Sequence, residues 1–122
     1  MTNIVKVNIL CLNTLLLFKM NLKLEDIKSN IKHISKIMHI LSNEERLLLL
    51  CQLSNKEMSV KEIEDFLDIK QPTLSQQLTI LRNAKLVQTR RSGKQIYYFM
   101  NDKKILNLMK SIHNEFCIGD KT

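Results

Sequence analysis

Three cysteines are the residues of this chain with the greatest capacity for covalent chemistry. Cys11, Cys51 and Cys117 lie far apart, and no two of them form a Cys-x-x-Cys pair. That spacing is typical of neither a secreted disulfide framework nor a zinc ribbon. Cys51 lies in the run LLLLCQL, where a free cysteine is ordinarily a small core residue. Any pairing between two of these thiols must therefore come from the fold.

A cysteine-dependent enzyme is one interpretation of these thiols. Either Cys51 or Cys117 could act as the nucleophile, with His113 as the base that activates it. The sequence offers no third group to orient the base and no glycine-rich oxyanion element. We therefore expect that the protein is not an enzyme.

The excess positive charge of the chain is confined to one segment. The 122 residues carry a net charge of +7. Eight lysines and arginines lie between Lys70 and Lys104 with one acidic residue, Asp102, whereas the rest of the chain holds eleven basic and eleven acidic residues. A basic segment of this kind favours binding to a polyanion such as nucleic acid. It argues against the competing interpretation, a module that binds only protein partners.

Apolar periodicity predicts four helices, a β-hairpin and a last helix. The first helix begins after Asn21 and carries a stripe for a core or a partner helix, at Ile27, Ile31, Ile34, Met38 and Leu41. Ser42 to Glu45 and Ser59 to Glu62 have the capping-box pattern, which predicts the starts of the next two helices. The third helix is expected to turn inward its three apolar residues, Ile63, Phe66 and Leu67.

The second part of this pattern has the dimensions of a helix-turn-helix followed by the hairpin. Pro72 fits the first position of the fourth helix, whose buried stripe is expected at Leu74, Leu78 and Leu81. Residues 86–90 and 95–100 have the alternation of two strands around a turn at Gly93. Asp102 can cap the last helix, which ends beside Cys117.

Seven polar side chains of this region have the chemistry to contact DNA. Uncharged side chains that both donate and accept hydrogen bonds can read base edges from the fourth helix: Thr73, Ser75, Gln76 and Gln77. Cationic side chains around the hairpin tip can reach phosphates or the minor groove: Arg90, Arg91 and Lys94. Together with the charge, these side chains predict double-stranded DNA as the partner.

The segment from about Ser42 to Cys117 resembles the ArsR family of winged-helix repressors. The resemblance rests on LSNEERLLLLCQL and on SVKEIEDFLDIKQPTLSQQLTILRNAKLVQTRRSGKQIYYFM, within which PTLSQQLTILRNAKLV is the most specific part. It implies a mainly α (α+β) winged helix-turn-helix fold and a homodimer built from the first and last helices. It also implies a repressor that binds a palindromic operator until an inducer arrives. The predicted DNA-contacting residues match the family's recognition helix and wing.

Two of the cysteines resemble those of the BigR, SqrR and HlyU branch of this family, whose members respond to persulfides and other oxidants. Cys51 and Cys117 match the two positions that this branch joins through a disulfide or a polysulfide bridge within one subunit. The resemblance implies that reactive sulfur species or an oxidant act as the inducer. Cys11 has no place in this pattern.

A metal inducer is the alternative within the family. The segment VKEIEDFLDI lacks the cysteines that the family's arsenic and cadmium sensors often carry there. The last helix offers Asp102, His113 and Glu115, but not the paired Asp-x-His and His-x-x-Glu spacing of the zinc sensors. We therefore expect no metal site and no cofactor, and a repressor without any inducer stays open.

The domain organisation is expected to be simple. Residues 1–19 are interpreted as an N-terminal extension from a mis-assigned start codon, 20–118 as the winged helix-turn-helix domain, and 119–122 as a tail. The apolar run over residues 5–18 superficially resembles a signal sequence, but it lacks a small-residue cleavage site and is too short to span a bilayer. We expect a cytoplasmic protein that makes no membrane contact.

Overall fold

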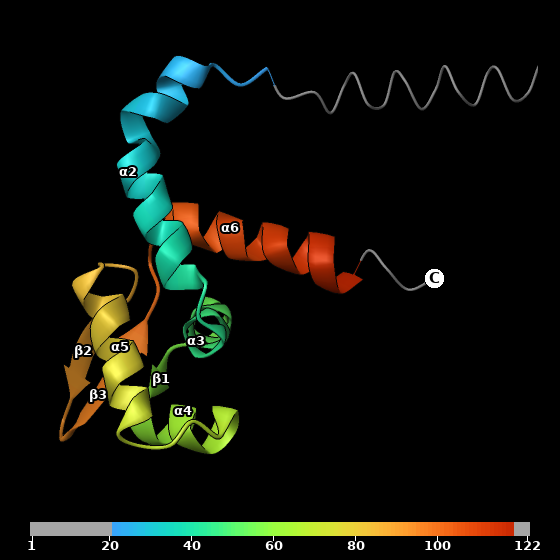
Figure 1. Ribbon diagram of the computed structural model, residues 1–122. Coiled ribbons are helices and arrows are strands. Elements are labelled where there is room, and N and C mark those ends of the chain that lie inside the picture. The colour runs from blue at the N-terminus through green and yellow to red at the C-terminus, as the bar shows by residue number, and fades with distance from the viewer. Residues whose placement is uncertain (1–20, 119–122) are drawn as a thin grey trace, which may run out of the picture. The chain divides into compact units, whose positions relative to one another are not determined.

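The computed structural model describes residues 21–118. Its elements are α2 (Leu24–Leu41), α3 (Glu44–Asn55), β1 (Met58–Ser59), α4 (Val60–Leu67), α5 (Thr73–Asn83), β2 (Gln88–Ser92), β3 (Gln95–Phe99), α6 (Lys103–His113) and the π-helical segment η1 (Asn114–Ile118) (Figure 1). The predicted order of four helices, a hairpin and a last helix is confirmed, and β1 is an addition to it. Cys11, the predicted extension and the predicted tail lie outside the described residues.

The chain divides into two units within α2, the first ending at Ser35 and the second beginning at Lys36. The second unit holds the hydrophobic core, to which α3, α4, α5 and α6 all contribute. Its most completely buried side chains are Leu49, Leu50, Ile63, Leu74, Leu78 and Leu81. The predicted stripe of α5 is thus confirmed, and each such leucine contributes about 1.5–3 kcal/mol by leaving water. Among the helices between residues 21 and 118, none is long and apolar enough to cross a membrane.

The helix starts show which predicted caps form. Ser59 accepts a hydrogen bond from the Glu62 amide and caps α4 as predicted. At α3 the prediction was wrong, because Asn43 and not Ser42 accepts from the Arg46 amide, at 3.0 Å. The Ser42 hydroxyl instead donates to the carbonyl of His39 at 2.6 Å, at the end of the preceding helix. Asn and Ser are equally good caps, so the neighbouring asparagine takes the role.

The start of α5 also differs from the prediction by one residue. Pro72 is the N-cap and not the first helical residue, and it offers no side-chain acceptor to the helix. The amide oxygen of Gln71 accepts from the backbone amide of Ser75 at 3.1 Å and from its hydroxyl at 2.6 Å. The side chain before the proline therefore satisfies an amide of the first turn, which would otherwise lack an acceptor.

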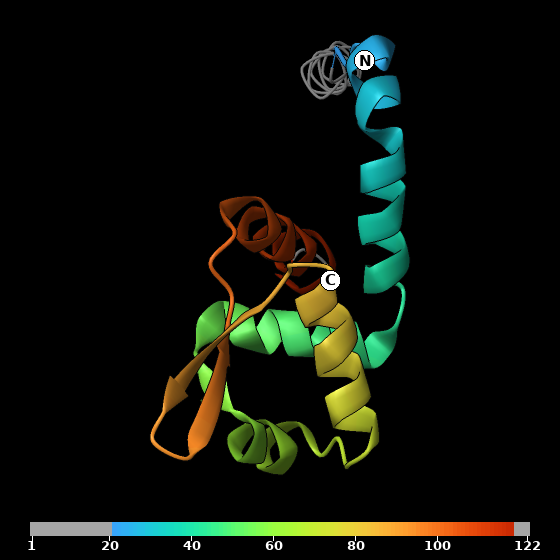
Figure 2. The same ribbon diagram turned by 90° about the vertical axis from the view of Figure 1, so that its left-hand side faces the viewer.

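Three antiparallel strands form one small sheet in the order β1-β3-β2. In the hairpin, Gln88 pairs with Phe99 and Ser92 with Gln95, and Gly93 has a φ of +64° in the turn between them. Only a residue without a Cβ takes that conformation at no steric cost. Strand β1 pairs Met58 with Tyr98 and joins the hairpin to the start of α4. Figure 2 shows the hairpin turn on the side of the unit away from α6.

One of the three side chains of α4 that were predicted to face the core does not do so. Phe66 on α4 is 65% exposed, whereas Ile63 is fully buried and Leu67 is half-buried. Successive helical residues are rotated by about 100°, so Phe66 and Leu67 flank Ile63 on opposite sides. In this eight-residue helix the core covers the side of Leu67, which leaves the phenyl ring in solvent.

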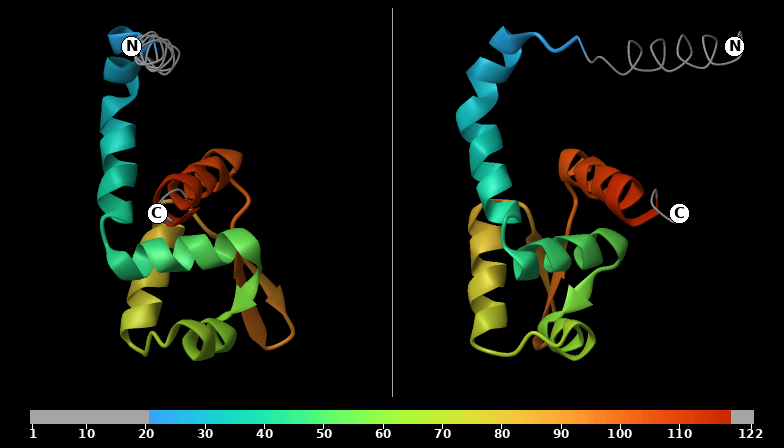
Figure 3. Two further views of the ribbon diagram at one scale, coloured as in Figure 1. Left: turned by 90° about the vertical axis from the view of Figure 1, so that its right-hand side faces the viewer. Right: turned by 45° about the vertical axis from the view of Figure 1, so that its right-hand side comes forward.

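Helix α3 lies in the middle of the second unit. Both views in Figure 3 place α6 on one side of α3 and α4 on the other. Helix α3 therefore packs against α4 and α5 as well as against the last helix.

Candidate DNA interface and thiol pocket

The predicted base-reading side chains of α5 differ in their surroundings. Gln76 is exposed, and no hydrogen bond holds its side chain among the described residues. The hydroxyl of Ser75 is exposed but donates to Gln71, and Thr73 is half-buried. Gln76 therefore has the side chain of α5 that is most available to a base edge.

Gln77 makes a contact inside the molecule. Its amide oxygen accepts from the Arg46 guanidinium at 2.9 Å, and Arg46 also donates through Nε to the carbonyl of Ile40 at 2.8 Å. Arg46 is only partly exposed, so water screens these bonds less than it screens surface contacts. One arginine thus connects the end of α2, the start of α3 and the recognition helix. The amide nitrogen of Gln77 is not used by this contact.

The three predicted wing cations also differ. Arg90 forms a two-point ion pair with Glu57, in the loop before β1, and its guanidinium lies 4.7 Å from the centroid of the Tyr97 ring. The hydrogen bond between Arg90 and Glu57 lowers the pKa of the Glu57 carboxyl and raises the pKa of the Arg90 guanidinium. This pair anchors the middle of the hairpin, where Arg90 and Tyr97 are cross-strand neighbours.

Arg91 and Lys94 lie nearer the tip. Arg91 donates to the carbonyl of Gly93 at 3.3 Å, and Lys94 is exposed in the turn. Exposed cations on a projecting turn can reach phosphates without first breaking an ion pair. These two residues have the surroundings expected of a DNA-contacting wing.

The two described cysteines are free thiols and lie in the second half of α3 and in η1. Cys51 is half-buried and packs against the core, and its thiol donates to the sulfur of Met109 at 3.8 Å. Cys117 is exposed. One thiol is therefore sheltered against α6, and the other is open to reagents in solution.

Electrostatics connects these two thiols. Burial raises the pKa of the Cys51 thiol, and the negative charge of a Cys117 thiolate raises that pKa further. Cys51 packs against Met109 of α6, and η1, which carries Cys117, directly follows α6. The fold thus places on packed elements two cysteines that are 66 positions apart in the sequence. At neutral pH, Cys51 is mainly a protonated thiol and not a nucleophilic thiolate.

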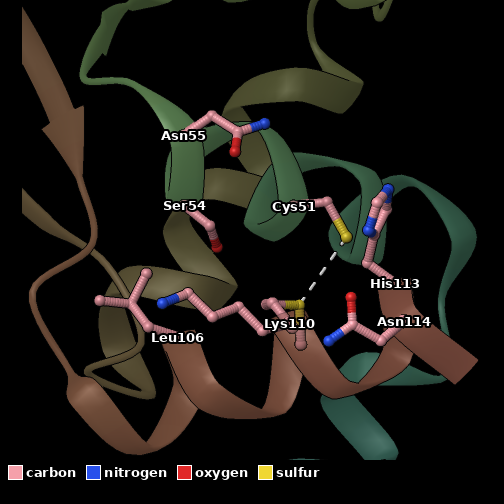
Figure 4. Close-up of a pocket in the computed structure, with 8 residues that line it drawn as sticks. Cys51, Ser54, Asn55, Leu106, Lys110, His113 and Asn114 are labelled. Carbon is pink, nitrogen blue, oxygen red and sulfur yellow. Dashed lines mark hydrogen bonds between the residues drawn. The ribbon is translucent and has the colours of Figure 1, made fainter.

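A pocket of about 220 Å³ opens beside Cys51, between α3 and the end of α6. It is lined by Cys51, Ser54, Asn55, Leu106, Met109, Lys110, His113 and Asn114. Figure 4 shows the Cys51 side chain and the His113 ring next to each other, whereas the Lys110 side chain extends toward Leu106, and the dashed line marks the contact between the sulfurs of Cys51 and Met109. His113, which the sequence offered as a base for a cysteine nucleophile, thus lines the same pocket as the Cys51 thiol.

Sequence reasoning missed several residues of these sites. Arg46 and Glu57 were not singled out, since their partners lie 31 and 33 positions away. Met109 and Lys110 were not singled out either. The spacing of Leu106, Met109, Lys110 and His113 places them on one face of a helix, but it does not say which element packs there. Within residues 21–118, no group of three potential ligands among His, Cys, Asp and Glu converges to hold a metal ion.

Known proteins resemble this chain over most of its length. Residues 43–89 match the family described as "Bacterial regulatory protein, arsR family". The Biofilm growth-associated repressor of Xylella fastidiosa (strain Temecula1 / ATCC 700964) is 39% identical over 97 residues, covering 80% of this chain and 85% of that protein. The Transcriptional activator HlyU of Vibrio cholerae is 29% identical over 96 residues, covering 79% and 89%. The crystal structure of the transcriptional repressor BigR from Xylella fastidiosa superposes with a TM-score of 0.75 at 38% identity, covering 79% of this chain and 98% of that one.

Proposed function

Because this chain belongs to the ArsR family of bacterial regulatory proteins, we propose that it is a transcriptional repressor that leaves its operator when Cys51 and Cys117 become linked. The fold is a DNA-binding winged helix-turn-helix, and the relatives are regulators and not enzymes. The observation that carries the sensing proposal is the packing of Cys51 against α6, beside the α3–α6 pocket, with Cys117 on η1, which directly follows α6.

Helix α5 enters the major groove in this proposal. Gln76 reads a base edge, and Thr73 and Ser75 add shorter contacts. Gln77 contributes through its amide nitrogen, since Arg46 uses its oxygen. The wing contacts the DNA backbone through Arg91 and Lys94, whereas Glu57 holds Arg90 in the middle of β2.

The operator is a palindrome because two copies of the chain bind it. The side chains Ile31, Ile34 and Met38 repeat at helical spacing on α2 and are 48%, 37% and 46% exposed. An apolar stripe of this kind is stabilised by a second copy, as a helix pair. Two recognition helices then reach major grooves about 34 Å apart.

The sensing reaction links the two sulfurs in two steps. One thiolate first bonds to the outer sulfur of hydrodisulfide as the S–S bond of the donor breaks, so hydrosulfide leaves and a cysteine persulfide forms. The second thiol then attacks the cysteine sulfur of this persulfide and displaces hydrosulfide, which forms a disulfide and needs the two Cα atoms within about 7 Å. If a second hydrodisulfide first extends the persulfide by one sulfur, attack at the middle sulfur displaces hydrosulfide and leaves a trisulfide bridge, which spans a larger gap.

The link acts on DNA binding through α3. Joining the ends of α3 and η1 changes how α3 lies against α6, and Arg46 connects α3 with the recognition helix. A tenfold loss of operator affinity requires only about 1.4 kcal/mol of coupling between the two sites. One covalent link is sufficient to supply it.

The test is a binding titration with fluorescently labelled DNA from the promoter of the protein's own gene. The reduced protein, the Cys51→Ser variant and the Cys117→Ser variant are each treated with sodium disulfide, and the bridge is mapped by mass spectrometry. We expect the untreated proteins to bind alike and treatment to lower only the affinity of the protein with both thiols. Cys11→Ser is the matched control and should respond like the unmodified protein.

Two results would overturn the proposal. If either Cys51→Ser or Cys117→Ser still releases DNA after treatment, a link between these two thiols is not the signal. If zinc releases the unmodified protein while sodium disulfide does not, the metal-responsive alternative holds. Repeated turnover of persulfide by the protein would instead favour the enzyme interpretation.

A further inference from the structure

The side of α5 that faces away from the core combines an amide with an apolar side chain. Leu74, Leu78 and Leu81 define the buried side of this helix. At about 100° per residue, Gln76 lies opposite these leucines, and Ile80 follows one turn later on nearly the same side. Gln76 is exposed, and Ile80 is 40% exposed although it is large and apolar. The outward face of the recognition helix is therefore not uniformly polar.

Two hydroxyl groups on this part of α5 are engaged within the molecule. The Ser75 hydroxyl donates to the side-chain oxygen of Gln71 at 2.6 Å, and the Thr79 hydroxyl donates to the carbonyl of Ser75 at 2.7 Å. A hydroxyl proton that is already donated is not available to a base edge. The exposed side chains in the middle of the helix that remain uncommitted are Gln76 and Ile80.

An exposed aliphatic side chain at this position has a defined use in the major groove. The C5 methyl of thymine is the apolar group that base edges present there. Helix α5 has no acidic residue, so none of its side chains repels DNA. A protein partner would need a broader apolar patch, whereas Ile80 is the one exposed large hydrophobic side chain within α5, all of which the structure describes.

We infer that Ile80 contacts the methyl group of a thymine in each half-site and, with Gln76, determines which sequence the protein selects. Gln76 can both donate to and accept from an adenine, and Ile80 removes water from the methyl group of a nearby thymine. Four residues span about 6 Å along the helix axis, so the two side chains reach base pairs that are close together. We therefore expect A·T pairs opposite the middle of α5. This inference rests on the operator binding proposed above and not on the reaction of the thiols.

Replacing thymine with uracil tests this contact, because the exchange removes the C5 methyl group and leaves base pairing intact. The half-sites in the promoter of the protein's own gene are first located by footprinting. Duplexes that each carry uracil at one symmetric pair of thymines are then titrated with the full chain by fluorescence anisotropy. Uracil at one such pair should lower the affinity about five- to twentyfold, as expected when one buried methyl group is lost in each half-site. Uracil outside the half-sites should have no effect.

Variants of Ile80 assign the effect to this side chain. Ile80→Ala should bind the intact operator more weakly, and uracil at the sensitive pair should cause it no further loss. Ile80→Val keeps a branched side chain and should retain part of the uracil effect. Ile96→Ala is the matched control and should retain all of it, because this isoleucine of β3 is similarly exposed, at 45%, and does not lie on α5. Circular dichroism and binding to a random duplex verify that each variant is folded.

Two results would overturn the inference. If uracil at no thymine of the half-sites weakens binding of the unmodified protein, the protein does not contact a thymine methyl group. If Ile80→Ala remains as sensitive to uracil as the unmodified protein, another side chain makes the contact.

The same duplexes separate this inference from the sensing proposal. If sodium disulfide does not release the unmodified protein while the uracil effect depends on Ile80, the sensing proposal fails and this inference stands. If sodium disulfide releases the DNA and uracil has no effect, the sensing proposal stands and this inference fails.

Discussion

At the scale of single residues, surroundings decide which polar side chains are available for function. Gln76 and Gln77 are neighbours of the same type, yet one is exposed and the other accepts a hydrogen bond from Arg46. Arg90 and Arg91 differ in the same way, because Glu57 holds only the first. Residue type alone therefore assigns equal roles to side chains that have unequal freedom.

The first prediction concerns how Gln76 and Arg91 contribute to DNA binding. Gln76→Ala should weaken binding to the specific site by about 1–3 kcal/mol and leave non-specific binding nearly unchanged, since a base-edge contact carries sequence information. Arg91→Ala should weaken binding to all DNA similarly and reduce its salt dependence. Titrations of specific and random duplexes at several salt concentrations measure both effects. Equal behaviour of the two variants would contradict the assignment of helix and wing.

A second prediction follows from the raised pKa of Cys51. Because a Cys117 thiolate contributes to that rise, Cys117→Ser should lower the pKa of Cys51. The thiolate fraction at Cys51 then increases at a given pH below its pKa, and alkylation by iodoacetamide becomes faster. The measurement is the rate of Cys51 alkylation between about pH 6 and pH 10, the range over which thiols titrate. Ser111→Ala, at an exposed position, is the control and should not change the pH dependence of the Cys51 alkylation rate. If Cys117→Ser does not change this pH dependence either, the two thiols do not interact.

At the scale of the elements, a few long-range side-chain contacts hold the DNA-binding parts in position. The ion pair of Arg90 with Glu57 fixes the hairpin to the loop before β1. Arg46 connects the start of α3 with the recognition helix and with the end of α2. Such contacts define the angle between elements that apolar packing alone would leave less well determined.

The third prediction tests the connection made by Arg46. Arg46→Met should reduce the free energy of unfolding by about 1–3 kcal/mol, because it leaves the Ile40 carbonyl and the Gln77 amide oxygen without a donor. Urea denaturation measures the loss, and exposed Lys61→Met on α4 is a control that should stay within about 0.5 kcal/mol. Combining Arg46→Met with Gln77→Ala should cost less than the sum of the two changes. Simple additivity would mean that the hydrogen bond contributes nothing.

At the scale of the whole molecule, one protomer leaves an apolar stripe of α2 exposed to water. The three α2 residues Ile31, Ile34 and Met38 are all at least one-third exposed, although each is large and apolar. A chain of this length buries a modest core and is stabilised by sharing apolar surface with a second copy. Assembly and DNA binding are therefore expected to depend on each other.

The fourth prediction places a charge in this stripe. Ile34→Asp should shift the protein from dimer to monomer in sedimentation velocity, because the carboxylate would be buried unpaired between two helices. Operator affinity should fall as the dimer dissociates, since a single recognition helix covers only one half-site. Lys36→Asp on the polar face of the same helix is the control for charge and should remain dimeric. A dimeric Ile34→Asp protein would exclude this stripe from the interface.

A fifth prediction concerns residues 1–19. A chain that begins at Met20 should dimerise and bind operator DNA like the full chain, because the apolar periodicity starts only after this residue. Both forms are compared in the sedimentation and titration experiments above. A large loss of either property in the shorter chain would contradict the interpretation of these residues as an extension.

Much of the fold could be predicted from the sequence because helix caps, turns and apolar repeats depend on residues that are close together in the chain. The apolar repeat of α5, the cap at Ser59 and the turn at Gly93 each depend on residues within a few positions of one another. Those signals were sufficient for the element order and for the helix-turn-helix. They failed where two adjacent residues competed for one role, as Ser42 and Asn43 did for the cap of α3.

Only the tertiary structure decided which side chains meet across the chain. Glu57 finds Arg90, and Lys110 and His113 come to Cys51, because α3, the sheet and α6 pack on one another. No sequence periodicity encodes such a pairing, since a helical face is specified by spacing but its partner is selected by the packing of the complete core. The sequence determined that a thiol would lie among leucines, and the fold placed it in a pocket that α6 lines with Met109, Lys110 and His113.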